Sequence, residues 1–288
     1  ISGYFLTPAF YDKNNIKAEL ENQISNQFNL KVKLGTSFKY GLFPKPHFHA
    51  KNTVISYKSS EVAKSNNTKI FISIKNLFSI NDIEIKDLVF RQTDFKINSL
   101  TYNFFINLLK NIKNNKEINF INSKLFYLDK NQDIIFLASL KRLNFLYQDD
   151  FLQMFNSKLD IFNIPITLQV EHNSFKKEFF TELNSRPLRL NIKSNSNYND
   201  KKLEGRLDFS AINKNNKINY SLENNFLNLN TDNNKFITNI NIKPFFIYSN
   251  AKFYQIDLKK IFKDNSILVN FLKSEVLNNK NLNGKITI

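Results

Sequence analysis

The sequence predicts a mainly β protein of antiparallel strands, with a short N-terminal helix and a few helices at the edges and the C-terminal end of the sheet. Apolar and polar residues alternate through most of residues 56–255, as in strands that bury one face only. Connections rich in Asn and Asp separate these runs at intervals of roughly 8 to 12 residues, which is typical of all-β proteins. Helical spacing of apolar residues is confined to a few stretches, chiefly 15–28, 100–112 and 256–277.

The N-terminal helix is expected over residues 15–28. Its apolar residues recur at every fourth position, at Ile16, Leu20, Ile24 and Phe28. That spacing places them on one helical face, and the carboxylate of Asp12 is available to cap the first turn. We expect this face to pack across the start of the sheet.

The strands that follow have an apolar face, and the alternation does not show what packs against it. A sandwich or closed barrel covers it with a second sheet and leaves no ligand space, whereas a single sheet curled lengthwise into a groove leaves an apolar trough for acyl chains. Both arrangements produce the same two-residue alternation of apolar and polar side chains. The central residues of the clearest runs, which would line such a trough, are Ile72, Ile85, Leu168, Leu190, Phe209, Tyr220 and Ile240.

Length and composition favour a single domain over residues 1–288. The chain contains only 6 Pro and 5 Gly, and no stretch resembles a flexible linker. We divide it into an N-terminal helix and strand-entry unit (1–55), a β-rich body (56–255), and a helical closing segment with a final strand (256–288).

The net charge of +16 comes almost entirely from lysine, because only 5 of the 41 basic residues are Arg. Nucleic-acid surfaces favour clustered Arg with interleaved aromatic residues, whereas these lysines are spread evenly along the sequence. We therefore interpret the charge as that of solvated strand faces. Attraction to an anionic lipid surface is the second interpretation and a polyanion-binding module the third.

The residues needed for catalysis are scarce. The chain has no Cys and three His, and its five glycines are too dispersed to form a phosphate-binding loop. His47 and His49 share a strand face, but no carboxylate nearby in sequence completes a metal-ligand set, so we interpret them as structural. The sequence thus predicts a protein that is not an enzyme and that uses neither cofactor nor metal.

The first 55 residues carry a recognisable order of elements. An uncharged opening (Ile1 to Pro8) leads into the helix, and the passage Phe43-Pro44-Lys45-Pro46 then opens an alternating strand that includes Val54-Ile55. This order resembles the N-terminal signature of the AsmA-like family. Two later segments are compatible with it, namely the Asp-centred turn between two strands at 127–133 and the ending Leu282-Asn283-Gly284-Lys285-Ile286.

The resemblance implies an elongated antiparallel sheet curled into an apolar-lined groove, in which phospholipid acyl chains are the principal partner. It implies a periplasmic protein, held to the inner membrane by an anchor upstream of Ile1, that binds or conducts phospholipid between the inner and outer membranes and supports outer-membrane biogenesis. Envelope proteins would be further partners, and nucleic acid would not. The alternative is a non-catalytic structural envelope scaffold with a closed, dry β core.

Overall fold

A computed structural model describes residues 2–75, 77–110, 116–129, 131–147, 151–211, 214–242, 245–252, 269, 273 and 283–287. These residues form two compact units, 1–159 and 160–288. The first contains the helices α1 (Ser2–Leu6), η1 (Thr7–Phe10), α2 (Lys13–Phe28), η2 (Ile80–Asp82) and α3 (Phe104–Lys110), and the strands β1 (Lys31–Lys33), β2 (Phe38–Gly41), β3 (His47–Tyr57), β4 (Ser60–Ile72), β5 (Ile85–Ile97), β6 (Glu117–Leu128) and β7 (Ile134–Tyr147).

Strand β8 (Leu152–Ile161) crosses the boundary between the units. The second unit contains β9 (Ile164–Asn173), β10 (Glu178–Ser185), β11 (Leu190–Tyr198), β12 (Lys202–Ala211), β13 (Lys214–Glu223), β14 (Phe226–Thr231), β15 (Phe236–Ile242), β16 (Phe245–Ala251) and β17 (Asn283–Thr287). The prediction of a mainly β fold with few helices is confirmed. The unit boundary falls inside the segment 56–255 that the sequence suggested was one body.

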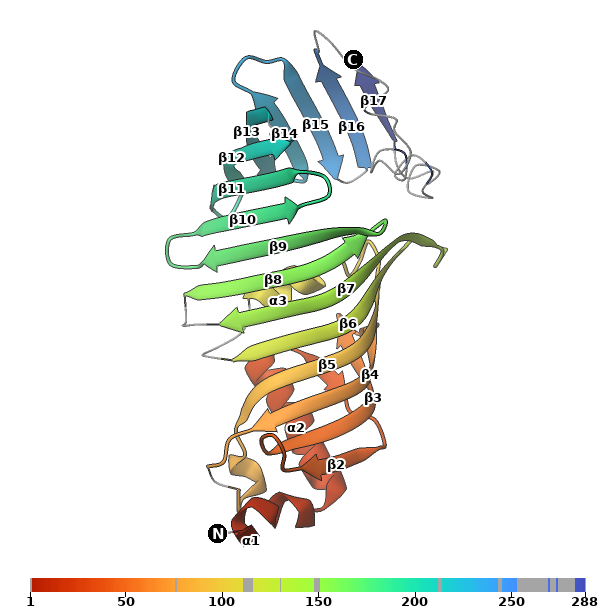
Figure 1. Ribbon diagram of the computed structural model, residues 1–288, viewed down its shortest axis with the longest axis vertical. Helices are drawn as coiled ribbons and strands as arrows, with labels where there is room; N and C mark the ends of the chain where they lie inside the picture. Colours follow the sequence, from red (N-terminus) through yellow and green to blue (C-terminus); the bar gives the residue numbers. More distant parts are fainter. Residues whose placement is uncertain are drawn as a thin grey trace. The chain divides into compact units, whose positions relative to one another are not determined.

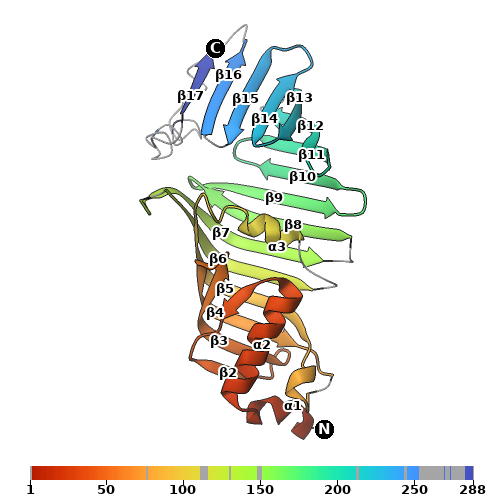
Figure 2. The same ribbon diagram turned by 180° about the vertical axis from the view of Figure 1, so that it is seen from behind.

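In the first unit, β1 and β2 both pair with β3, and the sheet continues through β4, β5, β6 and β7 as an open ladder. All of these pairs are antiparallel except β5–β6, so the sheet is mixed. A parallel pair needs a crossover connection, and the segment that contains α3 supplies it. Helices α2 and α3 lie on the same face of this sheet (Figure 1; Figure 2), and no described helix lies on the other face.

The predicted N-terminal helix is confirmed as α2. Asp12 caps it, because its side chain accepts hydrogen bonds from the backbone N–H groups of Asn14 (3.1 Å) and Asn15 (2.9 Å). Its expected apolar face is almost fully buried, with exposed fractions of 0–1% at Ile16, Leu20, Ile24 and Phe28. Asn29, in the left-handed conformation (φ 48°), ends the helix.

Helix α3 is shorter in the described residues than the predicted stretch 100–112. Its Phe104 is buried, and the rings of Phe104 and Phe105 lie 6.2 and 5.1 Å from that of Phe95 on β5. The buried Tyr147 of β7 donates a hydrogen bond to the Leu108 carbonyl (2.5 Å). These contacts fix α3 to the sheet and close the core of the first unit.

One irregularity recurs in five strands of this sheet at the same level. In β3 to β7, two consecutive residues lie outside the core between two buried ones, so the alternation slips by one residue. The registers place the slipped residues side by side, since each ladder is interrupted at them and resumes after the same number of residues on both strands. We call this row the seam, and its residues are Asn52, Asn66, Gln92, Asn122 and Lys141.

Left-handed backbone conformation produces the slip in three of these strands, at Asn52 (φ 55°), Gln92 (φ 53°) and Asn122 (φ 52°). Asn tolerates this conformation better than most residues. Buried hydroxyls beside the seam bond to backbone groups where the ladders are interrupted: Ser65 Oγ lies 3.1 and 3.2 Å from the carbonyl oxygens of Asn67 and Arg91, and the Thr93 N–H donates to Ser123 Oγ (3.2 Å).

In the second unit, β9 to β16 pair in sequence order, and every one of these pairs is antiparallel. Residues with positive φ form its tight turns, for example Phe162-Asn163 and Asn224-Asn225. The final strand β17 adds parallel to β16. The helices expected within 256–277 lie almost wholly outside the described residues.

Candidate functional site

The apolar face of the second unit is the candidate site for an acyl chain. Five of the seven residues proposed to line a trough lie in this unit, and the registers place them all on one face. Their directly paired neighbours are Leu168 with Leu183, Leu190 with Ser185, Phe209 with Ile192, Tyr220 with Gly205, and Ile240 with Leu227. The sheet thus carries a continuous apolar face from β9 to β16.

This face is neither fully buried nor fully exposed. All five predicted residues have intermediate exposure, as do paired neighbours such as Leu183, Ile192 and Leu227. The buried members of the face are small or hydroxyl residues close to the backbone, such as Ser194, Ser196 and Thr238, together with Ile166 and His172 on β9. The larger apolar side chains therefore present part of their surface outward.

Two hydroxyl groups on this face, those of Tyr220 and Ser194, bond to each other. Tyr220 is paired with Gly205, where an added Cβ would lie 2.8 Å from the tyrosine oxygen, so the glycine makes room for the ring. The Tyr220 hydroxyl lies 2.7 Å from Ser194 Oγ. Internal pairing of this kind leaves the apolar character of the surface intact.

At the β9 edge of the same face, His172 is buried and stacks on Phe179, with ring centres 4.4 Å apart. Its Nε2 lies 2.8 Å from the Tyr198 hydroxyl, and burial raises the pKa of Tyr198. His172 is therefore a buried residue and not a surface residue. Its neighbours in sequence are polar, but the strand alternation turns its ring onto the apolar face.

The other two predicted lining residues, Ile72 and Ile85, lie in the first unit. They are directly paired across β4 and β5 and have exposed fractions of 4% and 0%. They belong to the core closed by helices on one face of the sheet (Figure 2), so they offer no open surface to a ligand in this structure. Sequence alternation could not distinguish them from the other five.

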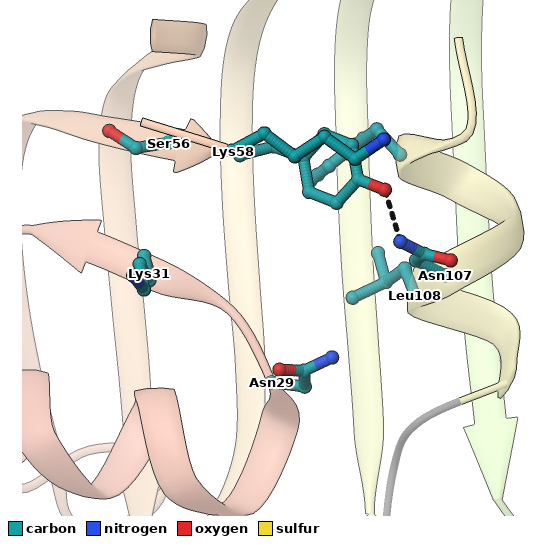
Figure 3. Close-up of a pocket in the computed structure, with 8 residues that line it drawn as sticks. Asn29, Lys31, Ser56, Lys58, Asn107 and Leu108 are labelled. Atoms are coloured by element: carbon teal, nitrogen blue, oxygen red, sulfur yellow. Dashed lines mark hydrogen bonds between the residues drawn. The ribbon is translucent and has the colours of Figure 1, made fainter. Parts of the chain in front are cut away.

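A pocket of about 190 Å³ lies in the first unit between the end of α2, the end of β3 and α3 (Figure 3). Its wall includes Lys31 and Lys58, and Asn107 donates a hydrogen bond to the Tyr57 hydroxyl beside it. Pockets for drug-sized ligands measure about 300–1,000 Å³. This one is therefore too small for a phospholipid.

The two histidines near Pro46 bond to neighbouring groups. His47 is buried and its Nδ1 lies 2.8 Å from the Lys45 carbonyl oxygen, whereas His49 Nε2 lies 3.2 Å from Asn67 Oδ1. Across the described residues, no cluster of three or more His, Cys, Asp or Glu side chains could hold a metal ion.

Comparison with known proteins gives no assignment: no protein-family model and no curated protein matches this chain. Among the described residues, no helix is long and apolar enough to cross a membrane.

Proposed function

We propose that this chain is a periplasmic protein, held to the inner membrane, that binds or conducts phospholipid between the inner and outer membranes and so supports outer-membrane biogenesis. The observation that carries the proposal is the apolar face of the second unit, whose large side chains remain half exposed over eight consecutive strands. Acyl chains would lie on this face while head groups stay in water. The resemblance of residues 1–55 to the AsmA-like family supports the same role.

This function requires no covalent step. Transfer of apolar surface from water to an apolar environment is favourable by about 25 cal/mol per Å². An acyl chain that covers this half-exposed apolar face therefore lowers the free energy.

The test measures fold and bound lipid on the same variants. We expect Leu168→Asp and Ile240→Asp to keep the circular dichroism spectrum of the unsubstituted protein, because a carboxylate at a half-exposed site can stay hydrated. Both should lose co-purifying phospholipid, read by solvent extraction and mass spectrometry. Asn228→Asp adds the same charge to the opposite face, since Asn228 pairs with Ser221 and not with the apolar row, and should retain lipid.

A structural scaffold with a dry core is the second candidate, and the first unit favours it. There Ile85 is fully buried, so Ile85→Asp should unfold that unit. If Leu168→Asp and Ile240→Asp also unfold the protein, or if the unsubstituted protein carries no lipid, the scaffold function replaces lipid binding.

A further inference from the structure

The strand registers gather basic residues that are dispersed in the sequence onto the helix-free face of the first unit. Three adjacent rows cross β3 to β7 there, namely the seam and the row on each side of it. One flanking row is Lys51, Asn67, Arg91, Ile121 and Arg142, and the other includes Lys64, Asp94 and Lys124. Six basic residues therefore lie together, and we call them the basic face: Lys51, Lys64, Arg91, Lys124, Lys141 and Arg142.

The basic face is exposed and almost free of acidic residues. All six of its residues are solvent-exposed, and Asp94 is the one acidic residue in the three rows. Within the described residues, no acidic side chain forms an ion pair with Lys51, Lys64 or Lys124. The strands are about 4.8 Å apart, so the rows spread this charge over roughly 20 Å.

The polar face of the second unit provides an internal comparison. Its basic residues alternate with acidic ones, and ion pairs join Lys193 to Glu182 (3.5 Å) and Arg206 to Asp232 (3.2 Å). Lys193 lies between Glu182 and Asp208 in one register row, and Lys217 lies opposite the same Asp208. On the basic face, Asp94 is the one acidic residue, and it lies directly opposite both Lys64 and Lys124. The two units therefore differ in charge although both follow the same alternation, and the excess positive charge is not a uniform property of solvated strands.

The chemistry of the basic face indicates its partner. Single-stranded nucleic acids are bound by basic grooves whose aromatic side chains stack on the bases, and the three rows contain no aromatic residue. They contain Asn and Gln side chains between the cations, which suit the phosphate and hydroxyl groups of lipid head groups. A bilayer that contains anionic lipid presents a dense array of such phosphates and attracts basic residues near its surface.

We propose that the basic face docks the first unit onto an anionic phospholipid bilayer. This surface is separate from the apolar face of the second unit, so docking does not depend on lipid carriage. The bilayer surface and the acyl chain would be bound by different units of the same chain.

Sedimentation with vesicles tests the proposal, using the whole chain. We expect binding to vesicles of phosphatidylglycerol and phosphatidylcholine, little binding to phosphatidylcholine alone, and loss of binding as salt rises. The triple variant Lys51→Gln, Lys64→Gln, Lys124→Gln should bind the anionic vesicles about a hundredfold more weakly, since each surface lysine contributes about fivefold. Circular dichroism confirms that the variant folds.

The matched control removes three charges from the polar face of the second unit through Lys193→Gln, Lys202→Gln and Lys217→Gln. We expect it to bind within a few fold of the unsubstituted protein. Equal losses in both triple variants would overturn the proposal, because the attraction would then come from net charge alone. Absence of binding to anionic vesicles would also overturn it, as would tighter binding to a single-stranded oligonucleotide that requires the same three lysines.

Discussion

Asp87 of β5 shows how one side chain can cost stability that the sequence does not reveal. It is half buried and lies directly opposite Glu117 in the parallel β5–β6 ladder. Burial, followed by the charge of Glu117, raises the pKa of Asp87, although Lys45, Lys86 and Lys116 act in the opposite direction. Asp87 is therefore harder to ionise in the folded protein than in the unfolded chain.

We therefore predict that Asp87→Asn increases the free energy of unfolding at pH 7. A carboxyl group whose folded pKa lies above its unfolded value of about 3.9 binds protons more tightly when folded, so stability falls as the pH rises through that window. The advantage of the variant should be full near pH 7 and should vanish below about pH 4. Urea unfolding across this pH range measures it, and Asp94→Asn, on the same strand, controls for loss of one negative charge. An advantage that is independent of pH would contradict the explanation.

At the scale of single elements, α2 depends on one buried face. Leu20→Ala should lower the free energy of unfolding by about 2–5 kcal/mol, because Leu20 is fully buried and its truncation leaves a cavity. The urea unfolding midpoint measures this. Asn22→Ala on the exposed side of the same helix should change stability by no more than about 0.5 kcal/mol. Similar effects of the two substitutions would show that the helix does not contribute to the core in this way.

At the seam, we predict a stability change opposite in sign to the one that strand propensity predicts. At an ordinary exposed strand position, Asn→Val is favourable because β-branched residues are enriched in strands. Asn122 has a φ of 52°, a conformation that costs a residue with a branched Cβ about 1–2 kcal/mol. Asn122→Val should therefore destabilise the protein by about that amount, whereas Asn122→Gly at the same site should be close to neutral. Chemical denaturation of the pair decides between the two effects, and a stabilising Val would show that the backbone there is extended.

At the scale of the molecule, the two units should differ in local stability. Strands β4 and β5 in the first unit and β12 and β13 in the second are all paired on both sides, so their backbone hydrogen bonding is matched. Among the side chains that the structure describes on these four strands, fully buried large ones such as Ile70 and Phe90 occur in the first unit alone. Amide hydrogen exchange followed by mass spectrometry should therefore be slower in β4 and β5 than in β12 and β13. Equal protection would mean that the apolar face of the second unit is as well covered as the core of the first.

Short-range patterns predicted the elements, and long-range pairing determined the surfaces. Helix α2 followed from its four-residue spacing, and the strands followed from alternation, because both signals lie within a few residues. Adjacent polar pairs such as Asn66-Asn67 and Lys141-Arg142 interrupt the alternation, so the position of the slip within each strand could be predicted from the sequence. Their alignment depends on registers between strands far apart in sequence, as does the gathering of the basic face. For the same reason, Ile85 and Leu168 looked alike in sequence although only Ile85 is in a closed core.

The seam also limits how the length of these strands can change during evolution. Deleting Asn122 alone would keep the inward and outward order within β6 but would offset the rest of that strand by one residue, about 3.3 Å, from both β5 and β7. The same deletion made in all five strands would restore every ladder. Insertions and deletions at these five positions are therefore expected to be tolerated when they occur together and not when they occur singly. The five sites span some ninety residues of sequence and are expected to change length together.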